Sequence, residues 1–178
     1  LPATITSIGY LAFYYCWNLT GQLSIPSTVK SISKYAFYGC HSLTAFSVSS
    51  SNTRYSSNNG ILLSKNQDTL FLCPNNKAGA YAIPNTVKRI HDSAFENCHS
   101  VNSVTIPSSV ISIGSYAFCN CSGITGNLTL SESVAILEDG AFSYCDKITG
   151  TVTIPSSLSG LGAYCFFESD SLQNFSVN

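Results

Sequence analysis

Eight cysteines and three histidines are the residues of this sequence with the greatest potential for chemistry. Cysteine and histidine bind zinc when closely spaced ligands converge, and a Cys–His pair becomes nucleophilic when a third group orients the histidine. Here His41 and His99 each follow a cysteine directly, and Cys119 and Cys121 form only a C-x-C. Neither spacing indicates a metal site or a catalytic pair. We therefore expect no metal, no cofactor and no enzymatic activity.

Acidic residues gather modestly late in the chain, at Glu132, Glu138, Asp139 and Asp146. We interpret them as solvated loop charges. The glycines are dispersed along the chain, so no phosphate-binding loop is predicted.

The composition excludes several classes of partner. Only 10% of the 178 residues are charged and the net charge is −1, so the chain lacks the basic surface that binds nucleic acid. No apolar run reaches the roughly 18 residues of a membrane span. The chain contains no Met and its first residue already lies inside a repeat, so we interpret it as a fragment of a longer protein.

The cysteines lead to the repeat that positions them. A pattern I-P-x-x-V-x-x-I-x-x-x-A-F-x-x-C recurs in six copies that begin at Leu1, Ile25, Ile83, Ile106, Leu130 and Ile154. The Ala-Phe pairs lie 24, 58, 23, 24 and 24 residues apart, so one interval holds an ordinary unit plus an enlarged one. The cysteines that share one repeat position are Cys16, Cys40, Cys98, Cys121 and Cys145.

A short apolar-x-apolar element precedes each Ile-Pro step and predicts a strand in each unit. A period in the low twenties with one strand per unit indicates a leucine-rich-repeat solenoid, of right-handed α/β or mostly-β type. The seven strands, stacked in parallel on a concave side, end at Ile25, Val48, Ile83, Ile106, Leu130, Ile154 and Val177.

The rest of each coil returns the chain along the convex side. We expect irregular turns or a short helical turn there, with the repeat Val, Ile, Ala and Phe pointing inward. Gly9, Gly114 and Gly162 follow the inward Ile or Leu, where we expect a tight bend or a positive φ. Residues 1–178 are thus predicted to form a single domain.

The pattern resembles the BspA-like, or Treponema-type, leucine-rich repeat of surface proteins from mucosal bacteria and parasitic protozoa. The resemblance covers nearly the whole chain and departs from the pattern at Ser131 for Pro, Cys165 for Ala and Ser169 for Cys. It implies a cell-surface or secreted module that binds proteins and serves adhesion or virulence.

Residues 49–82 form the enlarged repeat, which lacks the A-F-x-x-C arc. Turn signals bracket two apolar runs and predict a β-hairpin of 61–64 with 69–73 that projects from one side. Two interpretations stay open: a structural variant that bends the solenoid, or a loop that contacts a ligand.

The shared repeat position favours buried free thiols that stack from coil to coil, because small buried Cys side chains are common. Adjacent coils lie near the distance that a disulfide tolerates, so stacked disulfides remain an alternative. Outside this column we expect Cys119 to be exposed and Cys165 to be buried.

Two surfaces are candidates for binding. The first is the predicted concave face, whose outward side chains are small and uncharged: Gln22, Ser24, Ser47, Ser103, Thr105, Asn127, Thr129, Thr151, Thr153, Asn174 and Ser176. This row either packs to support the sheet or forms a shallow polar binding surface. The second is a group of aromatics expected to be exposed in the first two coils: Tyr14, Tyr15, Trp17 and Tyr38.

Two functions follow. One is a cell-surface module that binds a host matrix or cell-surface protein, and the other is a structural spacer with no ligand of its own. The sequence predicts no oligomeric state.

Overall fold

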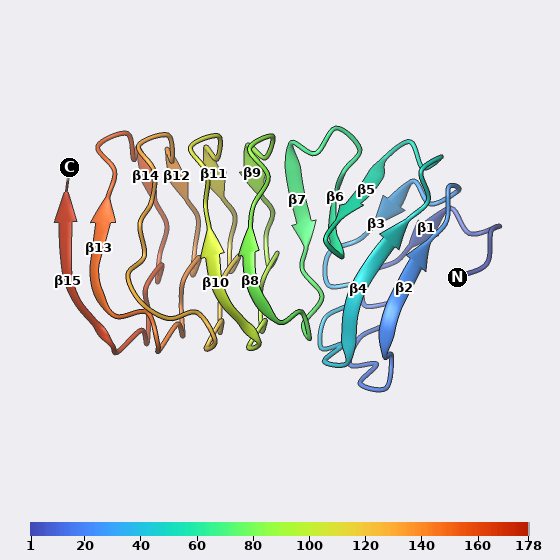
Figure 1. Ribbon diagram of the computed structural model, residues 1–178, viewed down its shortest axis with the longest axis horizontal. Helices are drawn as coiled ribbons and strands as arrows, with labels where there is room; N and C mark the ends of the chain where they lie inside the picture. The colour runs from blue at the N-terminus through green and yellow to red at the C-terminus, as the bar shows by residue number, and fades with distance from the viewer. Residues whose placement is uncertain (178) are drawn as a thin grey trace.

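The computed structural model, which describes residues 1–177, is a β-solenoid that winds steadily from the N-terminus to the C-terminus (Figure 1). Each regular coil contains a front strand, a turn, a two-residue strand on a second face, and a return arc. No helix occurs among residues 1–177. The predicted solenoid is confirmed in its mostly-β form, and the arcs are irregular rather than helical.

The front strands run parallel, as predicted, and form three pairs: β2 with β4, β8 with β10, and β13 with β15. Inward residues such as Leu23 and Ile25 are buried, while Ser24 between them is exposed. This alternation follows from the two-residue period of a strand. The strands are β2 (Gly21–Ile25), β4 (Leu43–Val48), β8 (Gly79–Ala82), β10 (Val101–Thr105), β13 (Gly150–Ile154) and β15 (Leu172–Val177).

The front strands do not form one continuous sheet of seven. The predicted strand ending at Leu130 pairs only through isolated bridges, Gly126 with Ile148 and Thr129 with Thr153. Its apolar side chains are nevertheless buried, so the predicted alternation holds where the backbone pairing is reduced. Between β4 and β8 the enlarged repeat intervenes.

A second face of short strands was not predicted. The regular coils supply β1 (Ser7–Ile8), β3 (Ser31–Ile32), β9 (Arg89–Ile90), β11 (Ser112–Ile113), β12 (Ile136–Leu137) and β14 (Gly160–Leu161). The last four join the strands of the enlarged repeat in a seven-stranded sheet, in the order β14-β12-β11-β9-β7-β6-β5. The repeat Ile or Leu lies at the second position of each short strand. In most coils this Ile or Leu is buried, so it anchors the short strand to the core.

The return arcs stack their repeat phenylalanines into columns. The Phe118 ring lies 4.8 Å from that of Phe95 and 4.9 Å from that of Phe142, and both pairs are nearly parallel. Phe13 and Phe37 form a separate pair at 5.2 Å. Stacking one coil on the next thus supplies most of the core.

The tight bends of the arcs lie beside the repeat Ala-Phe pair rather than at the predicted glycines. The residue before the Ala, such as Tyr116, and the second after the Phe, such as Asn120, have φ values of 57° and 56°. Gly114 has no positive φ. A side chain there would instead meet the coil before it, because an added Cβ would lie 2.7 Å from the Asp92 amide nitrogen.

The enlarged repeat contains three antiparallel strands: β5 (Tyr55–Asn58), β6 (Ile61–Ser64) and β7 (Thr69–Leu72). The pair β6/β7 lies where the hairpin is predicted, and β5 is an addition. The hairpin does not project, because β7 pairs in parallel with β9 and continues the second face. Ile61, Leu62, Leu63 and Leu70 are buried and Phe71 and Leu72 are partly buried, so this repeat is part of the core.

The buried residues divide into two clusters that meet at β6. Leu62 belongs to the N-terminal cluster, which begins at Ile8, whereas Ile61 and Leu63 belong to the C-terminal cluster, which extends to Cys165. Alternate side chains of one strand point to opposite faces. Strand β6 is therefore a wall that both clusters share.

Candidate functional site

The repeat cysteines connect neighbouring coils. Three of these thiols donate to the carbonyl of the repeat Phe one coil earlier, at 3.1 Å for Cys40, 2.9 Å for Cys121 and 3.0 Å for Cys145. The Ser169 hydroxyl makes the same bond at 2.9 Å, which explains why serine can replace the last cysteine. Cys98, which follows the enlarged repeat, instead lies 3.8 Å from the carbonyls of Cys73 and Pro74. This column is a structural feature, as its repeat position predicts.

All eight cysteines are free thiols, and the buried ones have low reactivity. Burial raises the pKa of Cys40 to about 11 and that of Cys145 to about 12. A neutral thiol is a poor nucleophile and a poor metal ligand. Two expectations were wrong: Cys16 is exposed, since within residues 1–177 a single coil packs against its own, and Cys119 is buried.

The histidines and acidic residues make isolated contacts. His99 Nδ1 lies 2.9 Å from Ser122 Oγ. Glu138 Oε2 accepts hydrogen bonds from the backbone and hydroxyl of Ser115 at 3.2 and 3.0 Å, so this carboxylate joins two coils. Across residues 1–177, no group of three His, Cys, Asp or Glu side chains could hold a metal ion.

The predicted concave row lies on the front strands, and its members stand in register from coil to coil. Ser24 lies opposite Ser47, and Thr129, Thr153 and Ser176 follow one another across two coil steps. Ser176 donates to Thr153 Oγ1 at 3.2 Å. The exposed members of the row are Gln22, Ser24, Ser103, Thr105, Asn127, Thr129, Asn174 and Ser176, whereas Ser47, Thr151 and Thr153 are partly exposed.

The N-terminal aromatics form a connected group on the first two arcs. Tyr14 packs on Tyr15 at 4.4 Å and on Tyr38 at 5.7 Å, and Tyr15 meets Trp17 edge to face at 6.0 Å. Trp17 is 61% exposed, and Tyr14 and Tyr15 are nearly half exposed. Tyr38 is less exposed than the sequence suggests, because the neighbouring tyrosines cover it.

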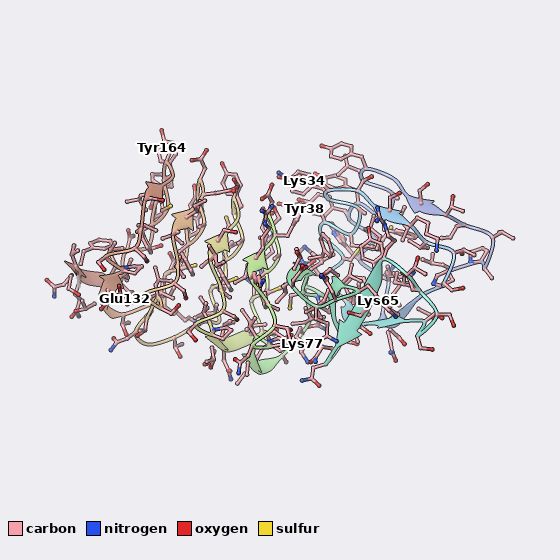
Figure 2. The ribbon with its side chains drawn as sticks, turned by 90° about the horizontal axis from the view of Figure 1, so that it is seen from above. Lys34, Tyr38, Lys65, Lys77, Glu132 and Tyr164 are labelled. Atoms are coloured by element: carbon pink, nitrogen blue, oxygen red, sulfur yellow. The ribbon has the colours of Figure 1, made fainter. Side chains whose placement is uncertain are left out.

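A pocket of about 90 Å³ lies beside this group, where one return arc is missing. One wall is the arc Ile32–Tyr38, the other includes His91, Asp92, Ser93 and Glu96, and side chains of the enlarged repeat form the floor. We call this pocket the arc gap. Figure 2 shows Lys34 and Tyr38 side by side where the N-terminal and C-terminal stacks of arcs meet. The sequence held a signal for it, since residues 49–82 lack the Ala-Phe pair.

The parallel front strands, the period of about 24 residues and the stacked phenylalanines define a leucine-rich-repeat solenoid. The sequence model of the family described as "BspA type Leucine rich repeat region" matches residues 1–78 and 71–178, in six copies. The chain belongs to this family. A comparison with curated protein sequences finds no match.

Solved structures share the fold. The pneumococcal vaccine antigen PcpA aligns with 90% of this chain and 39% of its own, at 21% identity and a TM-score of 0.84. A leucine-rich cell surface protein of Faecalibacterium prausnitzii covers all of this chain and 59% of its own, at 24% identity and a TM-score of 0.73. A T. pallidum leucine-rich repeat protein matches at 23% identity, 99% and 67% coverage, and a TM-score of 0.53. The chain thus spans about 39% and 59% of the first two.

Proposed function

We propose that this chain is the protein-binding module of a cell-surface or secreted protein. In this proposal it binds a host matrix or cell-surface protein through the front face, the exposed side of the front strands. The observation that carries the proposal is the row of uncharged side chains standing in register on the front strands. Membership of a family of surface proteins with this repeat supports the same assignment. Enzymatic activity is not part of the proposal.

The chemistry of the row suggests the kind of partner. Hydroxyls and amides spaced by one coil, about 4.8 Å, can hydrogen-bond an elongated polar surface without long-range charge attraction. Binding to such a row would depend weakly on salt, since no member is ionised. The alternative function, a spacer with no ligand, rests on the regular bonding between arcs, which makes a stiff rod.

The test is concentration-dependent binding of the purified chain to matrix proteins and host-cell surfaces. A front variant, Ser24→Glu, Thr105→Glu and Thr129→Glu, places three charges on exposed positions of the row. The matched control places the same three charges elsewhere, with Ser7→Glu, Ser31→Glu and Ser108→Glu, also at exposed positions.

Saturable binding that the front variant loses and the control keeps is the expected result. Binding retained by the front variant would assign the contact to another surface, such as the N-terminal aromatics. Absence of saturable binding across the panel would favour the spacer.

A further inference from the structure

Neighbouring return arcs are joined by a repeated set of backbone hydrogen bonds. In the arcs of Ala94, Ala117 and Ala141, three amides donate to the next arc: the residue before the Ala, the Phe, and the second residue after the Phe. In the first arc, the last two of these, Phe13 and Tyr15, do so. The Phe118 amide donates to the Ala141 carbonyl at 2.8 Å, and the Phe142 amide donates to the Cys165 carbonyl at 2.8 Å. Each arc therefore presents a row of donors toward the next one.

These backbone hydrogen bonds to the next arc are missing at the arc of Ala36. The corresponding donors are the amides of Tyr35, Phe37 and Gly39, and none of them donates to an acceptor within residues 1–177. The equivalent amides of later arcs donate to the next arc, and the enlarged repeat supplies no Ala-Phe arc at this place. Buried amides are nearly always hydrogen-bonded, so unpaired donors beside a pocket indicate a place for an acceptor.

On the opposite wall of the arc gap, two backbone carbonyls already accept hydrogen bonds. The Cys73 amide donates to the Ala94 carbonyl at 2.7 Å, and the Asn75 side chain donates to the Glu96 carbonyl at 2.8 Å. The end of the hairpin thus replaces the missing arc for the C-terminal stack. At the arc gap, the unpaired edge belongs to the N-terminal stack.

The floor and mouth of the arc gap suit a peptide with one apolar anchor. The floor is made of Phe37, Tyr55, Leu62, Phe71 and Leu72. At the mouth, Lys34 and Asp92 form an ion pair of 3.5 Å between the two walls, and both side chains are partly exposed.

Polar atoms without a partner line the second wall. Ser93 Oγ and Glu96 Oε2 are buried and make no hydrogen bond of standard geometry within residues 1–177, although Ser93 and Tyr38 lie close enough to Glu96 to interact with its carboxyl. Burial raises the pKa of the Glu96 carboxyl, whereas Ser93, Lys34 and Tyr38 nearby lower it. A bound segment can donate to these oxygens.

We propose that the arc gap binds a peptide segment of a partner protein, which takes the place of the missing arc. Its backbone carbonyls accept from Tyr35 and Phe37, an aromatic side chain lies on the Phe71 floor, and a neighbouring amide or cation donates to Glu96. This is the arc equivalent of adding a strand to an open sheet edge. The contact is separate from the front face and does not depend on it.

The probe is a labelled synthetic peptide with the sequence of residues 113–121, a complete arc, with its two cysteines replaced by serine. Binding to the full chain is followed by fluorescence anisotropy. A second peptide, in which alanine replaces the phenylalanine, tests the anchor. The variant Ser33→Trp fills the mouth from an exposed lining residue. The matched control is Gly9→Trp, at the same repeat position, also exposed and with open space around it, on an arc whose Phe13 and Tyr15 amides are bonded.

We expect Ser33→Trp and the alanine peptide each to weaken binding at least about tenfold, since each removes several contacts. Gly9→Trp and the charged front variant should bind as the unaltered chain does. In hydrogen exchange followed by NMR, the amides of Tyr35 and Phe37 should exchange quickly in the free chain and become protected by the peptide.

Three results would overturn the proposal. They are absence of peptide binding at millimolar concentration, binding that Ser33→Trp leaves unchanged, and binding without protection of the two amides. Self-association of the chain that Ser33→Trp abolishes would instead assign the arc gap to a second copy.

Discussion

Replacing Phe118 should destabilise the chain more than replacing any phenylalanine at the end of a column. Its side chain is 1% exposed and stacks on both neighbours, at 4.8 and 4.9 Å. Phe→Ala at a fully buried site costs about 3–5 kcal/mol, from lost burial and the cavity left behind. Phe13, which is partly exposed and stacks on one ring at 5.2 Å, should cost about 1–2 kcal/mol.

The assay is urea and thermal unfolding followed by circular dichroism. Phe118→Ala should lower Tm by roughly 10 °C, since each kcal/mol corresponds to about 2–4 °C for a domain of this size. Phe118→Leu keeps most of the apolar volume and loses only the ring contacts, so about 2 kcal/mol is expected. Equal losses for Phe118→Ala and Phe13→Ala would refute the reasoning, because the stacked column would then not carry the stability.

Three further outcomes follow from particular contacts. Gly114→Ala should destabilise by about 1–3 kcal/mol in urea unfolding, because its Cβ would meet the coil before it, whereas Gly9→Ala, with open space around it, should change stability by less than about 0.5 kcal/mol. Ser169→Ala should lower the free energy of unfolding by about 1–3 kcal/mol, because two hydrogen bonds are lost. Ser169→Cys should unfold with nearly the free energy of the unaltered chain. A Cys variant less stable than the Ala variant would contradict the role assigned to the column of thiols. Above about pH 9 the thiols of the unfolded chain ionise, whereas burial raises the pKa of Cys145 to about 12 in the folded chain. The unfolded state then binds fewer protons, so the stability should fall as the pH rises further. Cys145→Ser should make that fall less steep, and an unchanged slope would exclude this thiol as a cause.

The sequence was informative wherever a feature recurs. Each copy repeats the inward Phe and Cys, so the coil, the parallel front strands and the stacked thiols could be predicted from spacing. The hairpin could be located from its flanking turn residues, with β6 and β7 in the enlarged repeat.

The features that were missed depend on contacts between coils. Two-residue strands such as β11 are too short to show a period, and they form because the next coil supplies a partner. Strand β5 is polar and lacks alternation, so only its pairing with β6 identifies it. The need for glycine at Gly114 comes from the coil before it, which local turn rules do not include.

The candidate sites show the same limit. The front row could be named residue by residue, because it follows from the strand period. The arc gap could be suspected from the absent Ala-Phe pair. That the hairpin end caps one wall and leaves Tyr35 and Phe37 unpaired required the path of the chain in space.

The shared wall formed by β6 has a mechanical consequence. Two apolar clusters that meet at one four-residue strand make two elastic segments in series, and tension along the solenoid is transmitted between them through the enlarged repeat. The stack of phenylalanine rings that contains Phe37 and the stack that contains Phe95 are interrupted at the enlarged repeat. We therefore expect the enlarged repeat to unfold first under tension. Single-molecule pulling from the two termini should then record two separate extensions, and a single extension would mean that β6 couples the segments fully. A surface protein built this way would lengthen under shear in one half before the other.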